Sequence, residues 1–422
     1  MNLLYTALLY LLSPLFVLRL YWKSLGNPAY RQHWGQRFGL LPEPPFDSCI
    51  WIHAVSVGEV QASQELVRRL RELYPGQALV ISTTTPTGAD RVQLLFGDKV
   101  QHYYFPYDLP ISLRAWLGKV RPALLLMMET EIWPNLLQQC RREGIPTVLA
   151  NARLSEKSAR GYARLGSFTR RVLQSIDYVA AQSEEDAVRF QQLGIAAEKI
   201  SVTGSIKFDT RTPAIVQEQA EVMRRLWGVS RPVWIAASTR EGEEEIVLDA
   251  HAWLRETMPD ALLVLVPRHP ERFDRVAQMC EQRGFKVVRR SSGKACDEKT
   301  AVFLGDSMGE LAMMYQASDL AFVGGSLVKL GGQNILEPAS LGVPVLFGPY
   351  MYNFAGISQL LLQEQAAMQV GNAGELASQV QVWLSDAAER SRIGENGLRV
   401  VEANKGALDR LMQVIQQIPL QR

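Results

Sequence analysis

Short runs of apolar residues that alternate with amphipathic stretches constrain the fold of this chain more than any other feature. The runs form two series, residues 50–55, 78–82, 123–128, 147–150, 178–182 and 200–203, then residues 233–237, 262–266, 286–288, 302–304, 320–323 and 343–347. Continuous apolar runs bounded by Gly and Pro are typical of strands buried on both faces of a parallel sheet. Two such series, with helices between the strands, predict an α/β fold of two doubly wound, Rossmann-like domains.

The first apolar run of the chain is too long for a strand. Residues 3–18 carry no charge, and an extension to Trp22 adds only Arg19. This length is near the lower limit of about 17–25 residues for a membrane-spanning helix. A cleaved signal peptide needs basic residues before the run and small residues after it, but an aromatic pair and a lysine follow and nothing basic precedes. We therefore favour an uncleaved membrane anchor at residues 1–22; Pro14 leaves open whether it spans the bilayer or lies in one leaflet.

The charges and composition after the anchor suggest where the rest of the chain works. Basic residues on the C-terminal side of the anchor favour a cytoplasmic body: Arg19, Lys23, Arg31 and Arg37.

We expect an N-terminal domain at residues 23–206 and a C-terminal domain at residues 207–422, with the polar stretch 207–221, which contains Pro213, as the linker.

Composition excludes several classes of protein. With 45 basic and 43 acidic residues the net charge is +2, so the chain lacks the overall positive field of a dedicated nucleic-acid-binding protein. Its four cysteines are far apart and its five histidines show no metal-binding spacing. We therefore expect reduced thiols in a reducing compartment and no bound metal.

Charged residues follow several strands of the first series, at the edge where open α/β folds bind ligands. Glu59 in HAVSVGE falls in the first turn of a helix, where it would accept a hydroxyl proton as a general base or merely cap the helix. Glu129 directly follows the run LLLMM and would face the same cleft, whereas Glu131 is better explained as a loop residue or as a cap of the helix near Pro134. Lys207 in TGSIKFD would offset negative charge in the cleft or form a salt bridge between the domains.

The second series of strands is followed by residues suited to a nucleotide. Arg268 suits bidentate phosphate binding, with a surface Arg in a turn as the alternative. Glycine-rich loops within residues 324–348 flank a helix expected to begin near Asn334, whose free N–H groups would bind an anion, and Glu337 would accept hydrogen bonds from ribose hydroxyls. The loop 305–310 would also contact the nucleotide. Ordinary tight turns are the alternative, and the lack of a G-x-G-x-x-G or P-loop motif disfavours a hydride-transfer enzyme or an NTPase.

A basic stretch at residues 153–171 carries six Lys or Arg residues against the single acidic residue Glu156, with apolar residues interspersed. Such a stretch suits an anionic membrane surface or a phosphorylated lipid, and a solvated helix face is the alternative. The neighbouring anchor favours the membrane interpretation.

Nine sequence blocks occur together between the anchor and Pro349: HAVSVGE, TTTPTG, METEIWPN, ANARLS, TGSIKFD, LVPRHPERF, GDSMGEL, FVGGSLV and GGQNILEP. Together they resemble the 3-deoxy-D-manno-octulosonic acid (Kdo) transferases of Gram-negative lipopolysaccharide assembly. The resemblance implies a GT-B glycosyltransferase on the cytoplasmic face of the inner membrane. It implies transfer of Kdo from the donor CMP-Kdo to the lipid A precursor lipid IVA with inversion, without a cofactor or a protein-bound metal.

The resemblance also implies roles for individual residues. Glu59 corresponds to the catalytic base of the family, and Glu129 and Lys207 correspond to residues that stabilise the transition state. The CMP contacts fall on Pro267, Arg268, Met308, Gly309, Glu310, Asn334, Ile335, Leu336 and Glu337. Two alternatives stay open: another GT-B sugar-nucleotide transferase with a different lipid acceptor, and an exported two-lobed binding protein.

Overall fold

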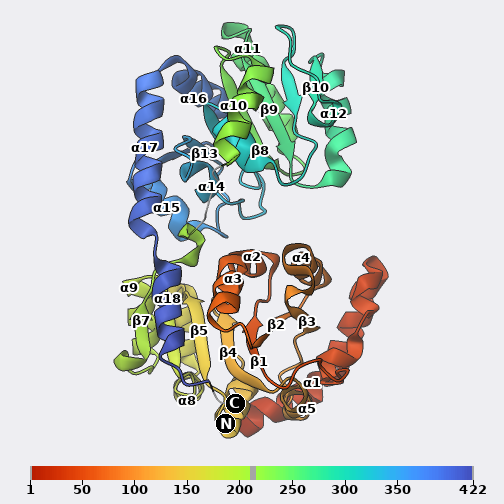
Figure 1. Cartoon of the computed structure of the whole chain (residues 1–422), viewed down its shortest axis with the longest axis vertical. Coiled ribbons are helices and arrows are strands. Elements are labelled where there is room, and N and C mark those ends of the chain that lie inside the picture. The colour runs from red at the N-terminus through yellow and green to blue at the C-terminus, as the bar shows by residue number, and fades with distance from the viewer. Residues whose placement is uncertain (1, 210–214, 421–422) are drawn as a thin grey trace. The chain divides into compact units, whose positions relative to one another are not determined.

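The computed structural model describes residues 2–209 and 215–420 (Figure 1). Contacts divide the chain into two compact units: unit 1 comprises Met1–Asp209 and Lys405–Arg422, and unit 2 comprises Thr210–Asn404. Each unit is built on one seven-stranded sheet in which all paired strands are parallel. The predicted α/β fold of two parallel-sheet domains is therefore confirmed.

The sheet of unit 1 has the strand order β3-β2-β1-β4-β5-β6-β7. Its strands are β1 (Cys49–His53), β2 (Ala78–Thr83), β3 (Gln101–Tyr104), β4 (Pro122–Met128), β5 (Thr147–Ala152), β6 (Tyr178–Ala181) and β7 (Ile200–Val202). The α-helices are α1 (Asn2–Gly26), α2 (Val57–Ala62), α3 (Gln64–Leu73), α4 (Pro86–Phe96), α5 (Pro110–Val120), α6 (Pro134–Glu143), α7 (Glu156–Arg164), α8 (Ser167–Leu173), α9 (Glu184–Gln192) and α18 (Ala407–Gln416). Short 3₁₀ turns are η1 (Pro28–Arg31), η2 (Trp34–Phe38), η3 (Gly97–Lys99), η4 (Ala197–Lys199) and η5 (Ile206–Phe208).

The sheet of unit 2 has the order β10-β11-β9-β8-β12-β13-β14. Its strands are β8 (Val233–Thr239), β9 (Leu262–Pro267), β10 (Val287–Arg289), β11 (Val302–Leu304), β12 (Leu320–Val323), β13 (Val345–Phe347) and β14 (Ala367–Gln369). Its helices are α10 (Ile215–Trp227), α11 (Glu244–Thr257), α12 (Phe273–Gln282), α13 (Leu311–Gln316), α14 (Leu336–Ala339), α15 (Ala355–Gln363), α16 (Ala373–Ser385), α17 (Ala387–Asn404), η6 (Pro270–Arg272) and η7 (Arg290–Ser292).

Successive residues of each central strand enter two separate hydrophobic clusters. In β1, Trp51 joins one cluster while Ile50 and Ile52 join the other. In β8, Trp234 and Ile235 divide between clusters in the same way. Because side chains alternate across a strand, this division means that apolar helices cover both faces of each sheet.

The last helix, α18, packs on unit 1 and not on unit 2. Its apolar face, formed by Ala407, Leu408, Leu411, Met412 and Ile415, completes the cluster that also contains Ile50 and Ile52. The carboxylate of Asp209 accepts hydrogen bonds from the backbone N–H groups of Gly406 and Leu408, at 2.6 Å each, and so fixes the start of the helix.

The predicted domain boundaries differ from this division in two respects. The C-terminal helix does not belong to the second domain, because its apolar stripe fills unit 1. Lys207 also lies in unit 1, in η5. Pro213 of the expected linker lies outside the described residues, and the end of that linker is already part of α10.

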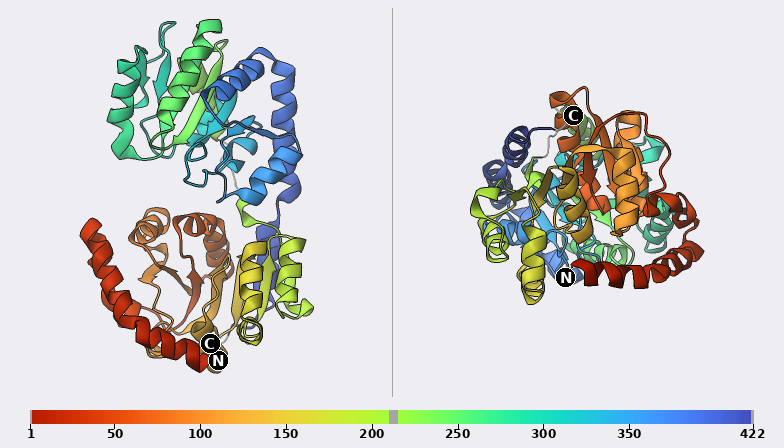
Figure 2. Two further views of the ribbon diagram at one scale, coloured as in Figure 1. Left: turned by 180° about the vertical axis from the view of Figure 1, so that it is seen from behind. Right: turned by 90° about the horizontal axis from the view of Figure 1, so that it is seen from below.

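Helix α1 is the one helix of the described residues that is long and apolar enough to cross a membrane, with a mean hydropathy of 1.8 over its most apolar window. It runs along the outside of unit 1 (Figure 2) and continues through Pro14. The Tyr5 hydroxyl donates to Asp108 Oδ2 at 2.9 Å, and Thr6 Oγ1 donates to Asn135 Oδ1 at 2.8 Å.

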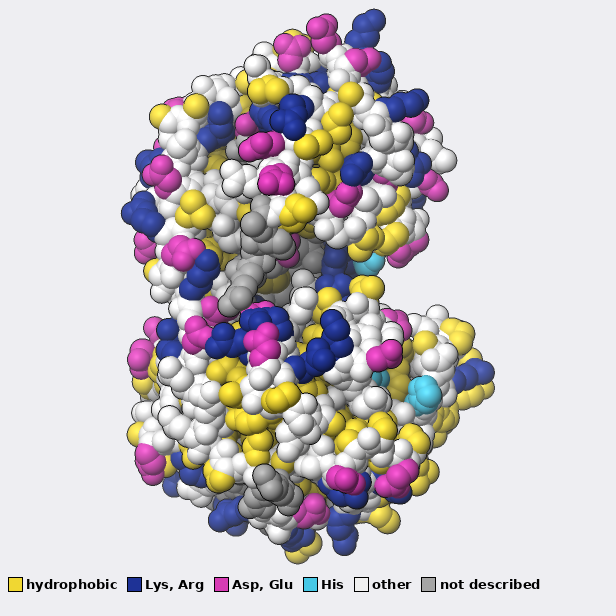
Figure 3. Space-filling view, viewed as in Figure 1, with side chains coloured by type: hydrophobic (Ala, Val, Ile, Leu, Met, Phe, Trp, Pro, Cys, Tyr) yellow, Lys and Arg dark blue, Asp and Glu magenta, His cyan; other side chains and the backbone are white. Residues whose placement is uncertain are grey.

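The other side of α1 is an apolar stripe with no covering partner among the described residues. Its exposed members recur every three or four positions: Leu4, Leu8, Leu11, Leu15, Leu18, Trp22 and Leu25. Apolar side chains gather where α1 lies at the edge of unit 1 (Figure 3). A helix with one docked side and one exposed apolar side is suited to contact with lipid.

Candidate active site

Glu59 lies in the first turn of α2, directly after β1, as the sequence predicts. The N-cap of α2 is Ser56. The Ser56 hydroxyl donates to Glu59 Oε1 at 2.7 Å and accepts from the Glu59 backbone N–H at 3.2 Å. Glu59 Oε2 accepts from the Val55 N–H at 2.8 Å. The carboxylate therefore helps to cap its own helix, which is one of the two roles expected from the sequence.

Burial makes Glu59 more basic than an ordinary carboxylate. The side chain is nearly buried, and desolvation raises its pKa, with a smaller contribution from the negative charge of Glu129; the hydrogen bonds from Ser56 and Val55 act in the opposite direction. Among the described residues, no Lys or Arg lies within ion-pair distance of Glu59. The carboxylate thus combines a fixed position with a raised affinity for a proton, which is what a general base requires.

The neighbouring Gly58 is not required by the packing of the chain itself. A Cβ placed on it would meet only the Ser56 hydroxyl, at 3.7 Å, and space is otherwise open. A glycine with free space, next to a carboxylate just after the carboxyl end of a strand, leaves room for a ligand to approach the backbone.

Glu129 follows β4 and is clamped between two cations. Its Oε1 lies 3.0 Å from Lys207 Nζ, and its Oε2 lies 3.1 Å from Arg153 Nε. The backbone of Glu129 is left-handed, with φ of +56°, a conformation that costs a non-glycine residue about 1–3 kcal/mol. The chain keeps a carboxylate at a position where glycine would be unstrained, and both cations of the cluster depend on it.

Lys207 is thus brought to Glu129, as the sequence placed both residues at the strand ends. The salt bridge of Lys207 with Glu129 is internal to unit 1. Arg153 was assigned to the basic stretch 153–171; its position beside Glu129 was missed, although it follows β5 in ANARLS as Glu129 follows β4.

Glu131 does not cap α6, contrary to one expectation. The first N–H groups of α6, from Asn135 and Leu136, instead donate to the carboxylate of Asp108 at 3.0 and 2.8 Å. Glu131 Oε2 accepts from the indole N–H of Trp133 at 2.9 Å and lies 4.0 Å from Nε2 of His53. Burial and the negative charges of Glu59 and Glu129 raise the pKa of Glu131 to about 7.

Three carboxylates therefore gather at the carboxyl ends of β1 and β4, the neighbouring central strands of unit 1. Glu129 is neutralised by two cations, whereas Glu59 and Glu131 have hydrogen-bond donors but no cation in the part of the chain that the structure describes. In the described part of the chain, no group of three His, Cys, Asp or Glu side chains is arranged to hold a metal ion.

In unit 2, Pro267 ends β9, and Arg268 follows it with its backbone N–H donating to Thr239 O at 3.0 Å. The charges of two candidate donor-site residues, Arg268 and Glu337, affect the pKa of the buried Tyr315 hydroxyl. Burial raises the pKa of Tyr315, the negative charge of Glu337 adds to the effect, and the positive charge of Arg268 opposes it. Arg268 and Glu337, which are far apart in sequence, therefore lie near one buried phenol.

The loop before α13 contributes Met308, Gly309 and Glu310. Met308 is exposed, whereas Glu310 accepts a bidentate pair of hydrogen bonds from Arg290, at 2.7 and 3.0 Å, and another from Ser307. Glu310 is thus committed to fixing this loop, and the exposed neighbours are the groups left for a ligand.

The segment Asn334–Glu337 differs from the expected anion site. Helix α14 begins at Leu336 and has only four residues. Its first N–H, from Leu336, donates to Asn334 Oδ1 at 3.1 Å. The side chains of Ile335 and Leu336 are fully buried, so only backbone groups at these two positions are able to meet a ligand. A helix this short, already capped, is a weaker anion site than the sequence suggested.

A buried carboxylate occupies the N–H groups of the glycine loop after β12. Glu243 Oε1 accepts from Ser326 and Leu327 N–H, at 2.9 and 2.8 Å, and Oε2 accepts from Gly325 N–H at 2.5 Å and Arg240 N–H at 2.9 Å. These donors are therefore not free to bind phosphate. Glu243 was not identified from the sequence, since nothing in an acidic run signals burial.

Close packing also explains one glycine of that loop. A Cβ on Gly324 would lie 2.7 Å from Thr239 Cα and 2.8 Å from Ser238 O. The chain's own backbone thus requires glycine here. For the glycine loop after β12, this close packing supports the alternative of an ordinary tight turn.

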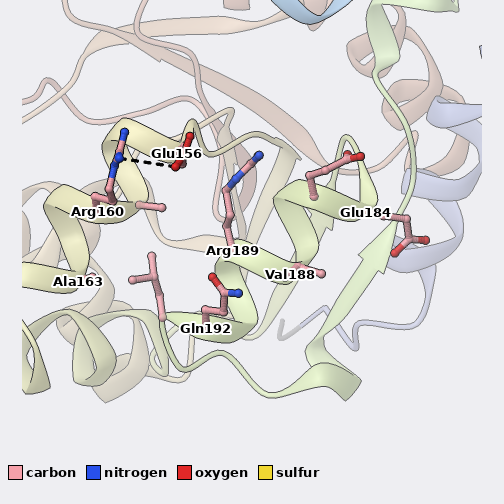
Figure 4. Close-up of a pocket in the computed structure, with 10 residues that line it drawn as sticks. Glu156, Arg160, Ala163, Glu184, Val188, Arg189 and Gln192 are labelled. Carbon is pink, nitrogen blue, oxygen red and sulfur yellow. Dashed lines mark ion pairs between the residues drawn. The ribbon is translucent and has the colours of Figure 1, made fainter.

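The basic stretch 153–171 forms α7 and α8, and α7 has no buried residue. A groove of about 570 Å³ separates α7 from α9 (Figure 4). Charged side chains line it from both helices, with Glu156 and Arg160 on α7 and Arg189 on α9, while Ala163 and Val188 add apolar surface. The membrane role of this stretch stays a prediction.

The fold and the clustered carboxylates first define the class of protein. The chain resembles UDP-GlcNAc 2-epimerase from Neisseria meningitidis bound to UDP-GlcNAc, with a TM-score of 0.59 and 13% identity over 88% of this chain and all of that one. It also resembles a glycosyltransferase from Rickettsia africae, with a TM-score of 0.55 and 14% identity over 89% and 99%. These similarities establish a GT-B-like fold, with two parallel sheets and one apolar N-terminal helix.

Sequence relatives then identify the family. The family model for 3-deoxy-D-manno-octulosonic-acid transferase (kdotransferase) matches residues 32–210. The chain is 43% identical to the 3-deoxy-D-manno-octulosonic acid transferase of Haemophilus influenzae over 97% of both chains, and 36% identical to that of Bordetella pertussis over 90% of both. The chain belongs to the 3-deoxy-D-manno-octulosonic acid transferase family and is a glycosyltransferase.

Proposed function

We propose that this Kdo transferase moves Kdo from CMP-Kdo to lipid IVA with inversion at the anomeric carbon, releasing CMP. The observation that carries the proposal is the environment of Glu59. This carboxylate is nearly buried and held by Ser56 and Val55, no cation of the described residues lies beside it, and its pKa is raised by burial. It is therefore suited to accept a proton at neutral pH.

In the proposed step, Glu59 takes the proton of a sugar hydroxyl of lipid IVA while that oxygen attacks the anomeric carbon of Kdo. The new carbon–oxygen bond forms as the bond from this carbon to the CMP phosphate oxygen breaks, and the electron pair leaves with CMP. Attack from the face opposite the leaving group inverts the centre. Glu59 afterwards releases its proton to solvent.

We propose that Lys207 and Glu129 stabilise the transition state, together with Arg153. The three side chains carry two positive charges and one negative charge. The net positive charge would offset the carboxylate of Kdo or the developing charge on the phosphate, and Glu129 would hold the two cations apart in a fixed geometry.

We propose that unit 2 binds the donor through Pro267, Arg268, Met308, Gly309, Glu310 and residues 334–337. Arg268 would pair with the CMP phosphate, and Glu337 would accept hydrogen bonds from the ribose. Ile335 and Leu336 would contribute backbone groups, since their side chains are buried. Glu310 would act mainly through the loop that it fixes with Arg290.

We further propose that the protein works on the cytoplasmic side of the inner membrane, where its lipid acceptor lies. The exposed apolar stripe of α1 would enter the lipid, and basic residues of α7 and α8 would contact anionic headgroups.

The test is to incubate the purified full-length protein with CMP-Kdo and lipid IVA and to read the product by mass. Glu59→Gln keeps the shape of the side chain and should lower turnover by at least about 10²-fold. Glu72→Gln, at an exposed position of α3, is the matched control. Near-normal turnover of Glu59→Gln would rule out Glu59 as the base.

A second measurement tests the donor. CMP should raise the thermal midpoint of the protein, and UDP should not. Stabilisation by UDP instead would favour a sugar-nucleotide transferase with another donor.

A further inference from the structure

The polar contacts of His53 distinguish it from His251, the other fully buried histidine of the described residues. His251 is satisfied by the chain, since Nδ1 accepts from the Trp234 indole at 3.2 Å and Nε2 lies 2.9 Å from Ala301 O. His53 has one such partner, Ser82 Oγ, 2.8 Å from Nδ1. Its Nε2 is buried and has no hydrogen-bond partner among the described residues.

The contacts of His53 allow its Nε2 to carry the ring proton. The Trp51 indole N–H donates to Ser82 Oγ at 2.8 Å, and the same oxygen lies 2.8 Å from Nδ1 of His53, so the Ser82 hydroxyl is able to donate to Nδ1. Burial lowers the pKa of His53 to about 3, against an opposing effect of the Ser82 backbone, so the ring is neutral and has one proton. With Nδ1 as the acceptor, that proton is on Nε2.

The proton on Nε2 faces Glu131. The Nε2–Oε2 distance is 4.0 Å, and the Trp133 N–H approaches the same oxygen at 2.9 Å. Both donors from the chain therefore lie on the Oε2 side. No donor among the described residues contacts Oε1, and the side chain keeps 24% of its surface exposed. Oε1 is thus the atom left for a substrate.

Four titratable groups face Glu131 from the elements around it: His53 from β1, Glu59 from α2, Glu129 from the end of β4 and Tyr162 from α7. Glu129 is neutralised by Lys207 and Arg153. Within residues 2–209 and 215–420, Glu59 and Glu131 are left as two carboxylates without a cation, in one partly dry site. Two such carboxylates tend to hold one proton between them near neutral pH.

We propose that Glu131 is a further residue of the acceptor site: it carries the single proton of the Glu59–Glu131 pair and donates it as a hydrogen bond from Oε1 to the acceptor sugar, while Glu59 stays ionised, with His53 as a positioning residue for Oε2. This inference rests on the proposed role of Glu59. The proton of Glu131 is not transferred during the reaction. The proton of the attacking hydroxyl goes to Glu59, as above.

The pH profile of Glu131→Gln tests the proposal, because Gln is a permanent mimic of the protonated acid. Wild-type kcat/KM should fall about tenfold per pH unit above the pKa of Glu131. Glu131→Gln should lose this alkaline decrease, so that its kcat/KM relative to wild type rises as the pH rises. Both proteins receive the same substrates, so titration of the lipid phosphates cancels in the comparison. Identical pH profiles would overturn the proposal.

Glu131→Ala removes the hydrogen bond itself. Below the pKa of Glu131, the kcat/KM of this variant should be at least about tenfold lower than that of wild type, mainly through KM for the acceptor, with KM for the donor unchanged. The difference should narrow at higher pH, where wild type has lost the same hydrogen bond. Glu72→Gln should match wild type throughout. An unchanged acceptor KM in Glu131→Ala would also count against the proposal.

Two variants of His53 test its positioning role. The amide nitrogen of Gln reaches as far as Nε2, whereas that of Asn reaches only as far as Nδ1. We expect His53→Gln to retain acceptor KM better than His53→Asn at equal thermal midpoints. Equal KM values for the two folded variants would contradict the role of Nε2. If Glu59→Gln is inactive while Glu131→Gln keeps the wild-type pH profile, this inference alone fails; if Glu59→Gln is active, the proposed function fails.

Discussion

Replacement of Glu243 by Gln should release the glycine loop after β12. The wild-type carboxylate accepts four backbone N–H groups on its two oxygens and is fully buried. Gln keeps one of these oxygens and replaces the other by an NH₂ group. Whichever way the amide turns, two N–H groups then face another donor instead of an acceptor.

The magnitude follows from the two lost interactions. A hydrogen bond to a charged group contributes about 1.5–3 kcal/mol, and a buried donor left without an acceptor is costly. Two such bonds give a local destabilisation of about 3–6 kcal/mol. Since 1.4 kcal/mol corresponds to a factor of ten in an equilibrium constant, opening of the loop should become at least about 100-fold more frequent.

Hydrogen exchange read by mass spectrometry measures this directly in the full-length protein. The peptide that covers residues 324–327 should exchange at least about 100-fold faster in Glu243→Gln, while peptides from the unit 1 sheet keep their wild-type rates. Glu241→Gln is the control. Glu241 lies in the same segment as Glu243, but it is exposed and pairs with Arg275. Wild-type protection of residues 324–327 in Glu243→Gln would refute the view that this carboxylate holds the loop.

Three further predictions concern unit 1. Gly58→Ala should fold normally, because a Cβ there meets nothing closer than 3.7 Å, yet raise KM for the acceptor; an unchanged KM would show that no ligand approaches this backbone. Lys207→Met should lower kcat by about 10²-fold with a smaller change in donor KM, measured by steady-state kinetics, and a change in KM alone would assign Lys207 to ground-state binding. Burial raises the pKa of Asp108 to about 7, so the folded protein binds an extra proton between about pH 4 and pH 7 and the contribution of Asp108 to stability falls as pH rises through this window. Hydrogen exchange of α6 should show this slope, at most about 1.4 kcal/mol per pH unit, and Asp108→Asn should abolish it.

Apolar runs predicted most strands of the two sheets, because parallel strands buried on both faces are apolar along their whole length. Strands β3 and β14 were not predicted, because they lack such an apolar run. The sequence of β3 is Gln-His-Tyr-Tyr, and β14 has exposed residues on an edge of its sheet. Edge strands bury less surface, so their composition carries less information.

Candidate site residues were predictable where a charge lies shortly after the carboxyl end of a strand. Glu59, Glu129 and Lys207 were selected in this way, and the structure brings Glu129 and Lys207 into contact. The partners Arg153, His53 and Glu243 were not found, because their roles depend on pairing across strands and on burial, which are tertiary properties. The end of the chain was misassigned for the same reason, since the apolar stripe of α18 does not reveal which core it fills.

The return of the chain to unit 1 has a consequence for biosynthesis. The ribosome delivers the apolar helix α1 and the whole first sheet long before α18, and unit 2 is complete before the last segment appears. The first sheet must therefore wait, with one part of its interior uncovered, until α18 has been made. Loss of α18 should then damage the half of the protein that was made first.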